Sequence, residues 1–341
     1  MKQIKCKPNS FLFILTAVIL PFLVCGCTEP SAISKIQTED GSGRSVVVKA
    51  AEILQDSLND DDPRIRTNAI EVVATTRQMH LMPIVDQLLT DRYIPVRFAS
   101  CLAVGDTKYS SSKKRLVSLL KAPDKNTQIA AAYALYKLGD KTQIQFIIQQ
   151  LNSPDMDVRA NAALVLGKSG DKTALNPLRK VIDARDSDDK VRFQAAESLA
   201  MLGDKTIYPK LWSMILNVNA DDRILGAQAM GDLGNEEAQG ALTTLMSDPN
   251  EIIEVRVAAA GQLGRLGSTI GEPHVIEALS AKTPLTTDPI RTERIYILAA
   301  MAIGEIKTPQ LTQYLPPLLN YRSKFVRLAA AKAVFQCDII D

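Results

Sequence analysis

Aromatic residues and histidine are scarce in this sequence. Only 5% of the 341 residues are Phe, Trp or Tyr, and a single one is Trp, whereas hydrophobic residues of all types make up 46%. A core of small and aliphatic side chains favours closely packed helices over a β-sandwich. The two histidines, His80 and His274, lie far apart in the chain, and a zinc site needs several ligands at set spacing. We therefore expect a helical protein without a metal or another cofactor.

A surplus of positive charge is also missing. The chain has 40 basic and 38 acidic residues, a net charge of +2. Three of the lysines, Lys2, Lys5 and Lys7, fall in the first 26 residues, which contain no acid, so 37 basic residues remain against the 38 acidic ones. A protein that binds nucleic acid needs a basic excess gathered on one face. Nucleic acid is therefore not an expected partner.

Residues 1–26 are predicted to be a lipoprotein signal peptide. Three lysines precede a mostly apolar run over residues 11–24, shorter than the ~20 residues of a membrane span. The run ends in Val-Cys-Gly-Cys at residues 24–27, which resembles the bacterial lipobox. The resemblance implies that Cys27 is lipidated and begins the mature protein; an ordinary cleaved signal or an uncleaved anchor is the alternative. Thr28 favours the outer membrane, facing the periplasm, over the inner membrane.

Residues 27–46 are predicted to be a flexible tether, because Thr, Glu, Pro, Ser, Asp and two Gly follow one another there without a helical period. Residues 47–341 are predicted to be the folded part. Only two cysteines remain in it, Cys101 and Cys337, near opposite ends of the repeat array described next. We expect both to be small hydrophobic residues rather than a disulfide.

A branched aliphatic residue followed by arginine recurs along the folded part, and we number the units one to nine by these pairs. The full pairs are Ile65-Arg66, Val96-Arg97, Val158-Arg159, Val191-Arg192, Val255-Arg256 and Val326-Arg327. Units three, six and eight keep the frame with Thr127-Gln128, Asp222-Arg223 and Ile295-Tyr296. The steps are 31 or 33 residues, with one of 40. A small residue three positions on and an apolar one seven positions on lie on the same face of a helix.

Five units then place a glycine followed by Asp, Asn or Ser, eleven residues after the arginine position. Glycine ends one helix, and the short polar residue caps the next. Each unit is thus two antiparallel helices, and the fold class is an all-α solenoid of about nine units. The units resemble the short HEAT-type repeat of phycobilisome bilin lyases and many bacterial scaffolds.

That resemblance implies a non-catalytic, protein-binding scaffold, which the lipid on Cys27 would tether to a membrane of the cell envelope. Its concave surface would be lined by the second helices and extend about 90 Å. The alternative is an enzyme, or a subunit that presents substrate to one, related to the bilin lyases. Deoxyhypusine hydroxylase shares the architecture and binds iron through His-Glu pairs, but Leu81 and Val275 follow the histidines here.

Two partner-binding sites are predicted. The first is an apolar groove on the concave face of units two to five, at the positions one and five residues after the arginine column and nearby. Its residues are Phe98, Leu102, Ile129, Tyr133, Tyr136, Leu164 and Phe193. Packing of these side chains between units is the alternative. The second site is the long turn of unit eight, rich in Pro and Thr, with Thr283, Leu285 and Thr286; drift of an exposed loop is the alternative.

The arginine column itself is interpreted as structural. Its guanidinium groups lie beside the buried stripe and can pair with acids in adjoining turns, such as Asp62, Asp157 and Asp189.

Overall fold

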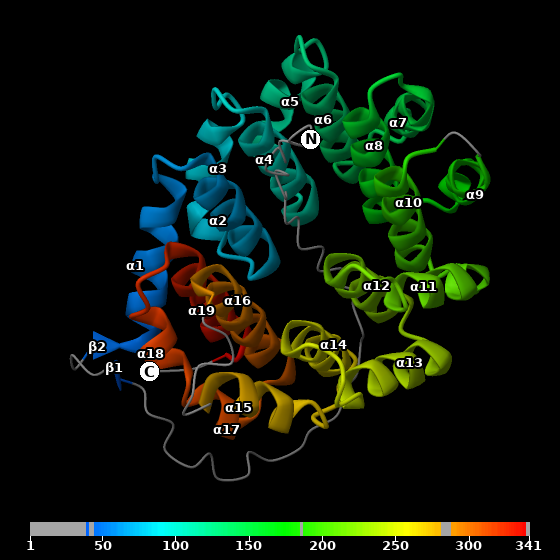
Figure 1. Cartoon of the computed structure of the whole chain (residues 1–341). Coiled ribbons are helices and arrows are strands. Elements are labelled where there is room, and N and C mark those ends of the chain that lie inside the picture. Colours follow the sequence, from blue (N-terminus) through cyan, green and yellow to red (C-terminus); the bar gives the residue numbers. More distant parts are fainter. Residues whose placement is uncertain (1–38, 41–43, 185–186, 281–287, 339–341) are drawn as a thin grey trace, which may run out of the picture.

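The computed structural model describes residues 39–40, 44–184, 187–280 and 288–338, and in these ranges nine pairs of helices form a ring (Figure 1). The first helices of the units are α1 (Val46–Leu58), α3 (Met82–Leu88), α5 (Lys113–Leu119), α7 (Gln143–Gln149), α9 (Leu175–Asp183), α11 (Tyr208–Ile215), α13 (Glu236–Ser247), α15 (Glu272–Ser280) and α17 with α18 (Pro309–Thr312, Leu315–Leu319). The second helices are α2 (Pro63–Thr75), α4 (Ile94–Thr107), α6 (Lys125–Lys137), α8 (Met156–Ser169), α10 (Asp189–Met201), α12 (Ala220–Leu233), α14 (Ile253–Arg265), α16 (Pro289–Ile306) and α19 (Lys324–Gln336). The predicted array of about nine two-helix units is confirmed.

Local sequence signals set the helix ends. Asp124 begins α6 by accepting a hydrogen bond from the Thr127 amide at 2.7 Å, and Asn219 begins α12 by accepting one from the Asp221 amide at 3.0 Å. The predicted turn glycines end the second helices with positive φ angles between 62° and 109°. They are Gly139, Gly170, Gly203, Gly234 and Gly267.

Close contacts hold neighbouring second helices together. A Cβ atom built on Gly167 of α8 would lie 2.7 Å from the Cα atom of Ser198 in α10, so α10 packs directly against the α8 backbone. Gly264 of α14 similarly leaves room for Ile306 of α16, because a Cβ atom built on Gly264 would lie 2.5 Å from the Ile306 Cγ1 atom. These glycines allow the second helices to approach one another closely. The second helices form the inner layer of the ring (Figure 1).

The ninth unit packs against the first. Helix α19 contacts α1 and α2, the Lys324 ammonium lies 2.5 Å from the Asp60 carboxylate, and the Lys332 ammonium lies 3.2 Å from the Glu71 carboxylate. The prediction of a concave array about 90 Å long is therefore wrong in its shape. Each unit is rotated relative to the one before it, and after nine units the apolar stripe of the last meets that of the first.

Residues that the sequence assigns to the tether include a short antiparallel pair. Strand β1 (Glu39–Asp40) pairs with β2 (Arg44–Ser45), with Glu39 opposite Ser45, and β1 lies near α18. Residues 39–40 and 44–45 are thus paired in a short strand ladder within the predicted tether, because backbone pairing can order polar residues that have no helical period. The predicted signal peptide and Cys27 lie outside the described residues. Within the described ranges, no helix combines the length and the apolar character that crossing a membrane requires.

Candidate binding surfaces

The arginine column lies where first helices end and second helices begin, and each guanidinium closes the turn of its own unit. Nη1 donates to a backbone carbonyl six residues earlier, at distances of 2.6–2.9 Å. The pairs are Arg66 with Asp60, Arg97 with Asp91, Arg159 with Ser153, Arg223 with Asn217, and Arg327 with Tyr321. This bond ties the second helix to the turn that precedes it.

The same guanidinium groups pair with an acid in the turn of the next unit, at 2.6–2.9 Å. These pairs are Arg66–Asp91, Arg97–Asp124, Arg159–Asp188 and Arg223–Glu251. Units three and eight lack the arginine: Gln128 keeps only the carbonyl bond, to Ala122 at 2.6 Å, and the Tyr296 ring packs edge-on against Tyr321 with centroids 5.1 Å apart. The arginines of units five and seven have other partners: Arg192 Nη2 donates to the Ala184 carbonyl at 2.7 Å, and Arg256 pairs with Glu277 of α15 at 3.0 Å. The structural interpretation of the column is confirmed.

Two of the three acids proposed from sequence for this column have other partners. Asp62 pairs with Arg64 at 2.7 Å and Asp157 with Lys190 at 2.6 Å, whereas Asp189 does pair with a column arginine, Arg192 of its own unit, at 3.5 Å. The prediction is therefore wrong for Asp62 and Asp157 and confirmed for Asp189. In units one, two and four, the acid that reaches the column arginine belongs to the following turn and lies at or within two residues of the cap of the next second helix.

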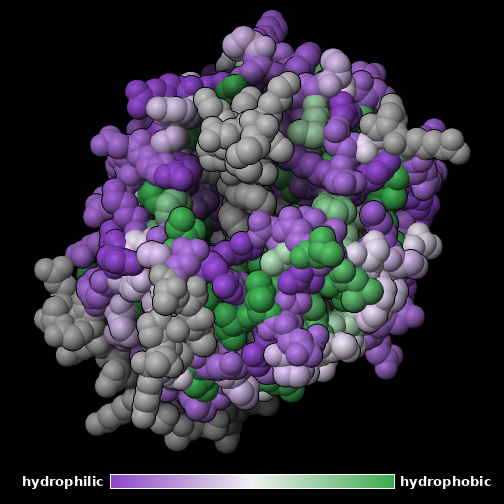
Figure 2. All heavy atoms as spheres, in the orientation of Figure 1, coloured by the Kyte–Doolittle hydropathy of each residue, from purple (hydrophilic) through white to green (hydrophobic). Residues whose placement is uncertain are grey.

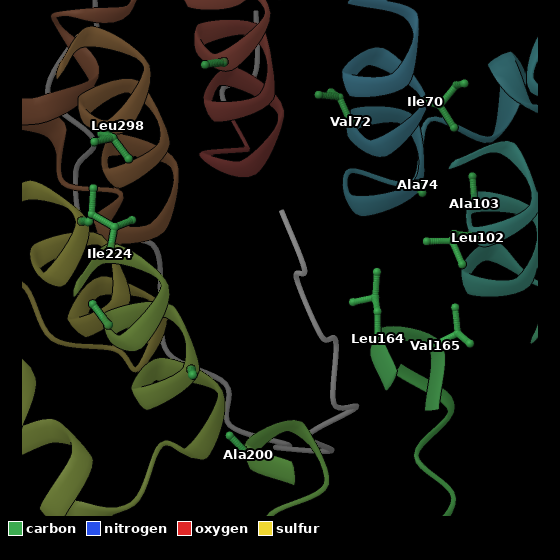
Figure 3. Close-up of a cluster of buried hydrophobic side chains, with 14 of the residues drawn as sticks. Ile70, Val72, Ala74, Leu102, Ala103, Leu164, Val165, Ala200, Ile224 and Leu298 are labelled. Carbon is green, nitrogen blue, oxygen red and sulfur yellow. The ribbon is translucent and has the colours of Figure 1, made fainter. Parts of the chain in front are cut away.

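The predicted apolar groove of units two to five is not exposed. Six of its seven residues are buried, with between 0% and 6% of their surface exposed: Phe98, Leu102, Ile129, Tyr133, Tyr136 and Leu164. Phe193 is half-buried, and the Lys210 ammonium lies 5.5 Å from its ring centroid. Figure 3 shows Leu102 and Leu164 within the hydrophobic cluster, turned towards the inside of the ring.

The expectation that these side chains are exposed is wrong, and packing between units describes them. Their polar ends are occupied as well, because the Tyr133 hydroxyl donates to Asp106 and the Tyr136 hydroxyl donates to Asp171 at 3.0 Å. In a closed ring the second helices converge on the inside. In units two to four, positions one and five of the second helices are therefore covered by their neighbours.

The second predicted site, at Thr283, Leu285 and Thr286, lies outside the described residues and stays a prediction. The described residues that follow it in the sequence, at the start of α16, line a pocket of about 470 Å³ where the starts of α2, α16 and α19 meet. Its walls include Asp62, Glu293, Lys324 and Phe325 together with Ile290, which is 80% exposed. The start of α16 thus lies at the seam between the last and the first unit.

An apolar stripe runs along the outward side of α11 in unit six. Tyr208, Trp212 and Leu216 are spaced four residues apart, so they lie on the same side of successive helical turns. The Tyr208 and Trp212 ring centroids are 6.2 Å apart. Trp212 is 36% exposed, Leu216 64%, and the adjacent Val218 98%. We call these four residues the α11 stripe. The sequence analysis did not predict it, and the one Trp of the chain is the signal that could have found it.

The face shown in Figure 2 is mostly hydrophilic, and its apolar residues gather over α12 and α14, next to α11 in the ring. Exposed apolar residues that adjoin one another mark interaction sites more often than single ones do. The α11 stripe contains Tyr208 and Trp212, and Tyr and Trp are enriched among the energetically dominant residues of protein interfaces.

Several titratable groups have shifted pKa values, each with a structural cause. Burial raises the pKa of Asp232 to about 6, although the Arg265 guanidinium lies 2.9 Å away and acts to lower it. Burial raises the pKa of Cys337 to about 12 and that of fully buried Cys101 further. Burial and the neighbouring Arg256 charge lower the pKa of His274. No three metal-binding side chains gather anywhere in the part of the chain that the structure describes.

Comparisons with known proteins identify the repeat. Residues 81–149 and 144–227 match the family described as HEAT repeats. Among solved structures, the complex of CpcE and CpcF of phycocyanin lyase from Nostoc sp. PCC7120 is 19% identical, with a TM-score of 0.42 over 74% of this chain and 93% of that one. Human deoxyhypusine hydroxylase is 16% identical, with a TM-score of 0.32 over 86% and 97%. No curated protein sequence matches the chain.

Proposed function

We propose that this ring of HEAT repeats is a non-catalytic scaffold that is held at a bacterial membrane by lipid on Cys27 and binds a protein partner through the α11 stripe. The exposure of Trp212, Leu216 and Val218 carries the proposal. Leaving large apolar side chains in water costs roughly 25 cal/mol per Å² of apolar surface, so a partner that covers them gains that free energy. Replacing a Trp that is buried at a protein interface by Ala often costs about 2 kcal/mol or more of binding free energy.

A scaffold role is supported by how the charged groups of the ring are used. The column arginines close turns and join neighbouring units, and the buried Asp232 pairs with Arg265. These contacts stabilise the array rather than leave a reactive group poised beside an open site. The outside of the ring then offers the surface for a protein partner.

The anchor rests on the lipobox at residues 24–27. Twelve residues lead from Cys27 to Glu39, the first described residue, and they span about 40 Å when extended. Strand β1, where that segment joins the ring, lies on the side opposite α11 (Figure 1). A ring held by this segment presents α11 away from its attachment point, which favours a protein over the anchoring membrane as the partner of the stripe. Thr28 favours the outer membrane, facing the periplasm.

The test is capture from envelope extract with the lipidated protein, comparing wild type with Trp212→Ala/Leu216→Asp. The matched control is Val117→Asp on α5, because Val117 is also exposed, at 50%, and lies outside the stripe. We expect one specific partner to be recovered by wild type and by the control, and to be lost with the double variant. Equal recovery by all three proteins would refute the stripe as the binding surface.

The anchor is tested separately. Cys27→Ser should abolish labelling by a fatty-acid analogue and leave the signal peptide uncleaved, while capture through the stripe persists. Labelling that survives in Cys27→Ser would contradict the lipid anchor without affecting the stripe.

A further inference from the structure

A group of charged side chains lies on the inner wall of units two to four, near the carboxyl ends of the second helices. Asp106, Lys137 and Lys168 occupy the same position, nine residues after the arginine column, on α4, α6 and α8. Leu102 and Leu164 lie one helical turn before Asp106 and Lys168 and are turned to the inside of the ring (Figure 3), so Asp106 and Lys168 follow on the same helical face. Lys137 has the equivalent repeat position on α6, between them.

The acid of this group is already occupied. The Lys168 ammonium lies 3.1 Å from the Asp106 carboxylate, and the Lys168 side chain is only 9% exposed. The Tyr133 hydroxyl, from the helix between them, donates to the same carboxylate. Asp106 is thus held by a cation from α8 and by a donor from α6, and its one charge is balanced by Lys168.

Lys137 has no such partner. Among the described residues, no hydrogen bond or ion pair reaches its ammonium, which lies 6.0 Å from the Tyr133 ring centroid. Its side chain is half-buried. Desolvation of the ammonium by burial lowers the pKa of Lys137; Asp106 opposes this shift, and the charges of Lys168, Lys108 and Lys141 reinforce it.

The surrounding elements add further cations. Lys108 caps the end of α4, and Lys141 follows α6, with its ammonium 3.7 Å from the Tyr136 ring centroid. The acids of the neighbouring turns are used locally: Asp140 accepts from Thr142 at 2.6 Å, and Asp171 accepts from Thr173 at 2.8 Å. Lys108, Lys137, Lys141 and Lys168, which we call the lysine cluster, thus exceed the acids that face them.

Helix carboxyl ends explain how the ring holds these charges. Helices α4, α6 and α8 all end at this rim, and the partial negative charge of a helix carboxyl end favours cations nearby. That charge belongs to backbone carbonyls and gives the Lys137 ammonium no hydrogen-bonded anion. An anion that comes within hydrogen-bond distance of Lys137 would relieve both its desolvation and the repulsion between the lysines.

We propose that the lysine cluster is a binding site for an oxyanion, a carboxylate or a phosphate, on a ligand that reaches the inner wall of the ring. Lys137 and Lys108 make the direct contacts with the oxyanion. Lys168 remains paired with Asp106 and so holds α8 against α4. The site is separate from the α11 stripe, which is on the outside of the ring. A result that refutes one of the two binding proposals therefore does not affect the other.

The test uses the full chain with Cys27→Ser and two probes, inorganic pyrophosphate and a fluorescein-labelled peptide of consecutive glutamates. Titration calorimetry and fluorescence anisotropy at about 0.15 M salt should detect binding of at least one probe. Binding of pyrophosphate alone indicates a small ligand, and binding of the peptide indicates an acidic protein segment. Lys137→Gln should weaken the binding by ~10-fold or more, and Lys137→Arg, which keeps the charge, should retain most of it.

The matched control is Lys180→Gln on the outer helix α9, which should bind like wild type. Lys137 makes no hydrogen bond in the described structure, so Lys137→Gln should unfold no earlier than wild type in the absence of a probe. Pyrophosphate or the peptide should raise the melting temperature of wild type and leave that of Lys137→Gln unchanged. The proposal is overturned if neither probe binds wild type more tightly than about 1 mM, or if the Lys137→Gln and Lys180→Gln proteins bind alike.

Discussion

Replacing Arg97 tests how the arginine column joins one unit to the next. Its Nη2 atom lies 2.7 Å from the Asp124 carboxylate, its Nε donates to the Thr127 hydroxyl at 3.1 Å, and its Nη1 donates to the Asp91 carbonyl at 2.8 Å. Asp124 in turn caps α6. One side chain thus connects the turn of its own unit with the first turn of the next unit's second helix.

The size of the loss follows from these contacts. The side chains of Arg97 and Asp124 are 16% and 17% exposed, so the pair is mostly but not fully desolvated. Breaking a fully buried pair costs about 3–5 kcal/mol, and a hydrogen bond to a charged group contributes about 1.5–3 kcal/mol. We expect Arg97→Gln to lower the free energy of unfolding by about 2 kcal/mol, because Gln can keep the carbonyl bond that Gln128 makes in unit three. Arg97→Ala should cost about 1 kcal/mol more.

The pH dependence identifies the cause. Burial acts to raise the pKa of Asp124, but hydrogen bonds from Thr127 and Arg97 outweigh it and lower the pKa below the ordinary 3.8. A lowered acid pKa stabilises the fold above the unfolded-state pKa, and this stabilisation is lost as the pH falls through the folded-state pKa. The deficit of Arg97→Gln should therefore be full at neutral pH and shrink as the pH falls below 3.8.

Urea unfolding followed by circular dichroism at several pH values measures this deficit. Arg64→Gln is the control, because the Arg64 side chain is 72% exposed and its ion pair with Asp62 should contribute little. An Arg97→Gln protein within about 0.5 kcal/mol of wild type at neutral pH would refute the reasoning, as would a deficit that does not change with pH.

Gly167→Ala should destabilise the protein by about 2 kcal/mol or more, because its Cβ atom would lie 2.7 Å from the Ser198 Cα atom. Gly240→Ala in α13 should instead stabilise the protein by up to about 1 kcal/mol, because no atom lies within 4 Å of the added Cβ atom. Thermal melts in which Gly167→Ala is more stable than Gly240→Ala would contradict this packing. The raised pKa of Asp232, about 6, means that its stabilising contribution is full below pH 3.8 and is lost as the pH rises through 6. The unfolding free energy of Asp232→Asn relative to wild type should thus improve by about 3 kcal/mol between pH 3.5 and 7. A difference in unfolding free energy between the two proteins that does not change with pH would argue against burial as the cause of the raised pKa.

The repeat architecture could be predicted from the sequence because its signals are local. A helix ends where glycine must adopt a positive φ angle, as at Gly203, and a helix face is marked by residues three and four apart. The arginine column could be recognised for the same reason. Its exact acids could not, since Asp157 is only two residues from Arg159 in the sequence whereas Asp188 is 29 residues away, and only the packing of two units brings Asp188 to Arg159.

Closure of the ring and the exposure of its surfaces depend on geometry that no single unit encodes. A small change in the rotation between units, summed over nine of them, decides between an open array and a ring. Closure also decides whether side chains such as Tyr133 line a groove or are covered, and Tyr133 is fully buried. The lysine cluster could have been found by aligning Asp106, Lys137 and Lys168 in one column, but their mutual distances come from the packing.

Every surface described above follows from the closure of the ring, and cross-linking across the seam tests it most directly. The protein carries Asp60→Cys and Lys324→Cys, whose native side chains lie 2.5 Å apart, with its other cysteines replaced. A short bismaleimide should join the two cysteines within one molecule, and the product should migrate faster in denaturing gels. The control pairs Asp60→Cys with Lys180→Cys on α9, across the ring (Figure 1), and should stay uncross-linked. Failure of the seam pair to cross-link, or equal cross-linking of both pairs, would contradict the closed ring.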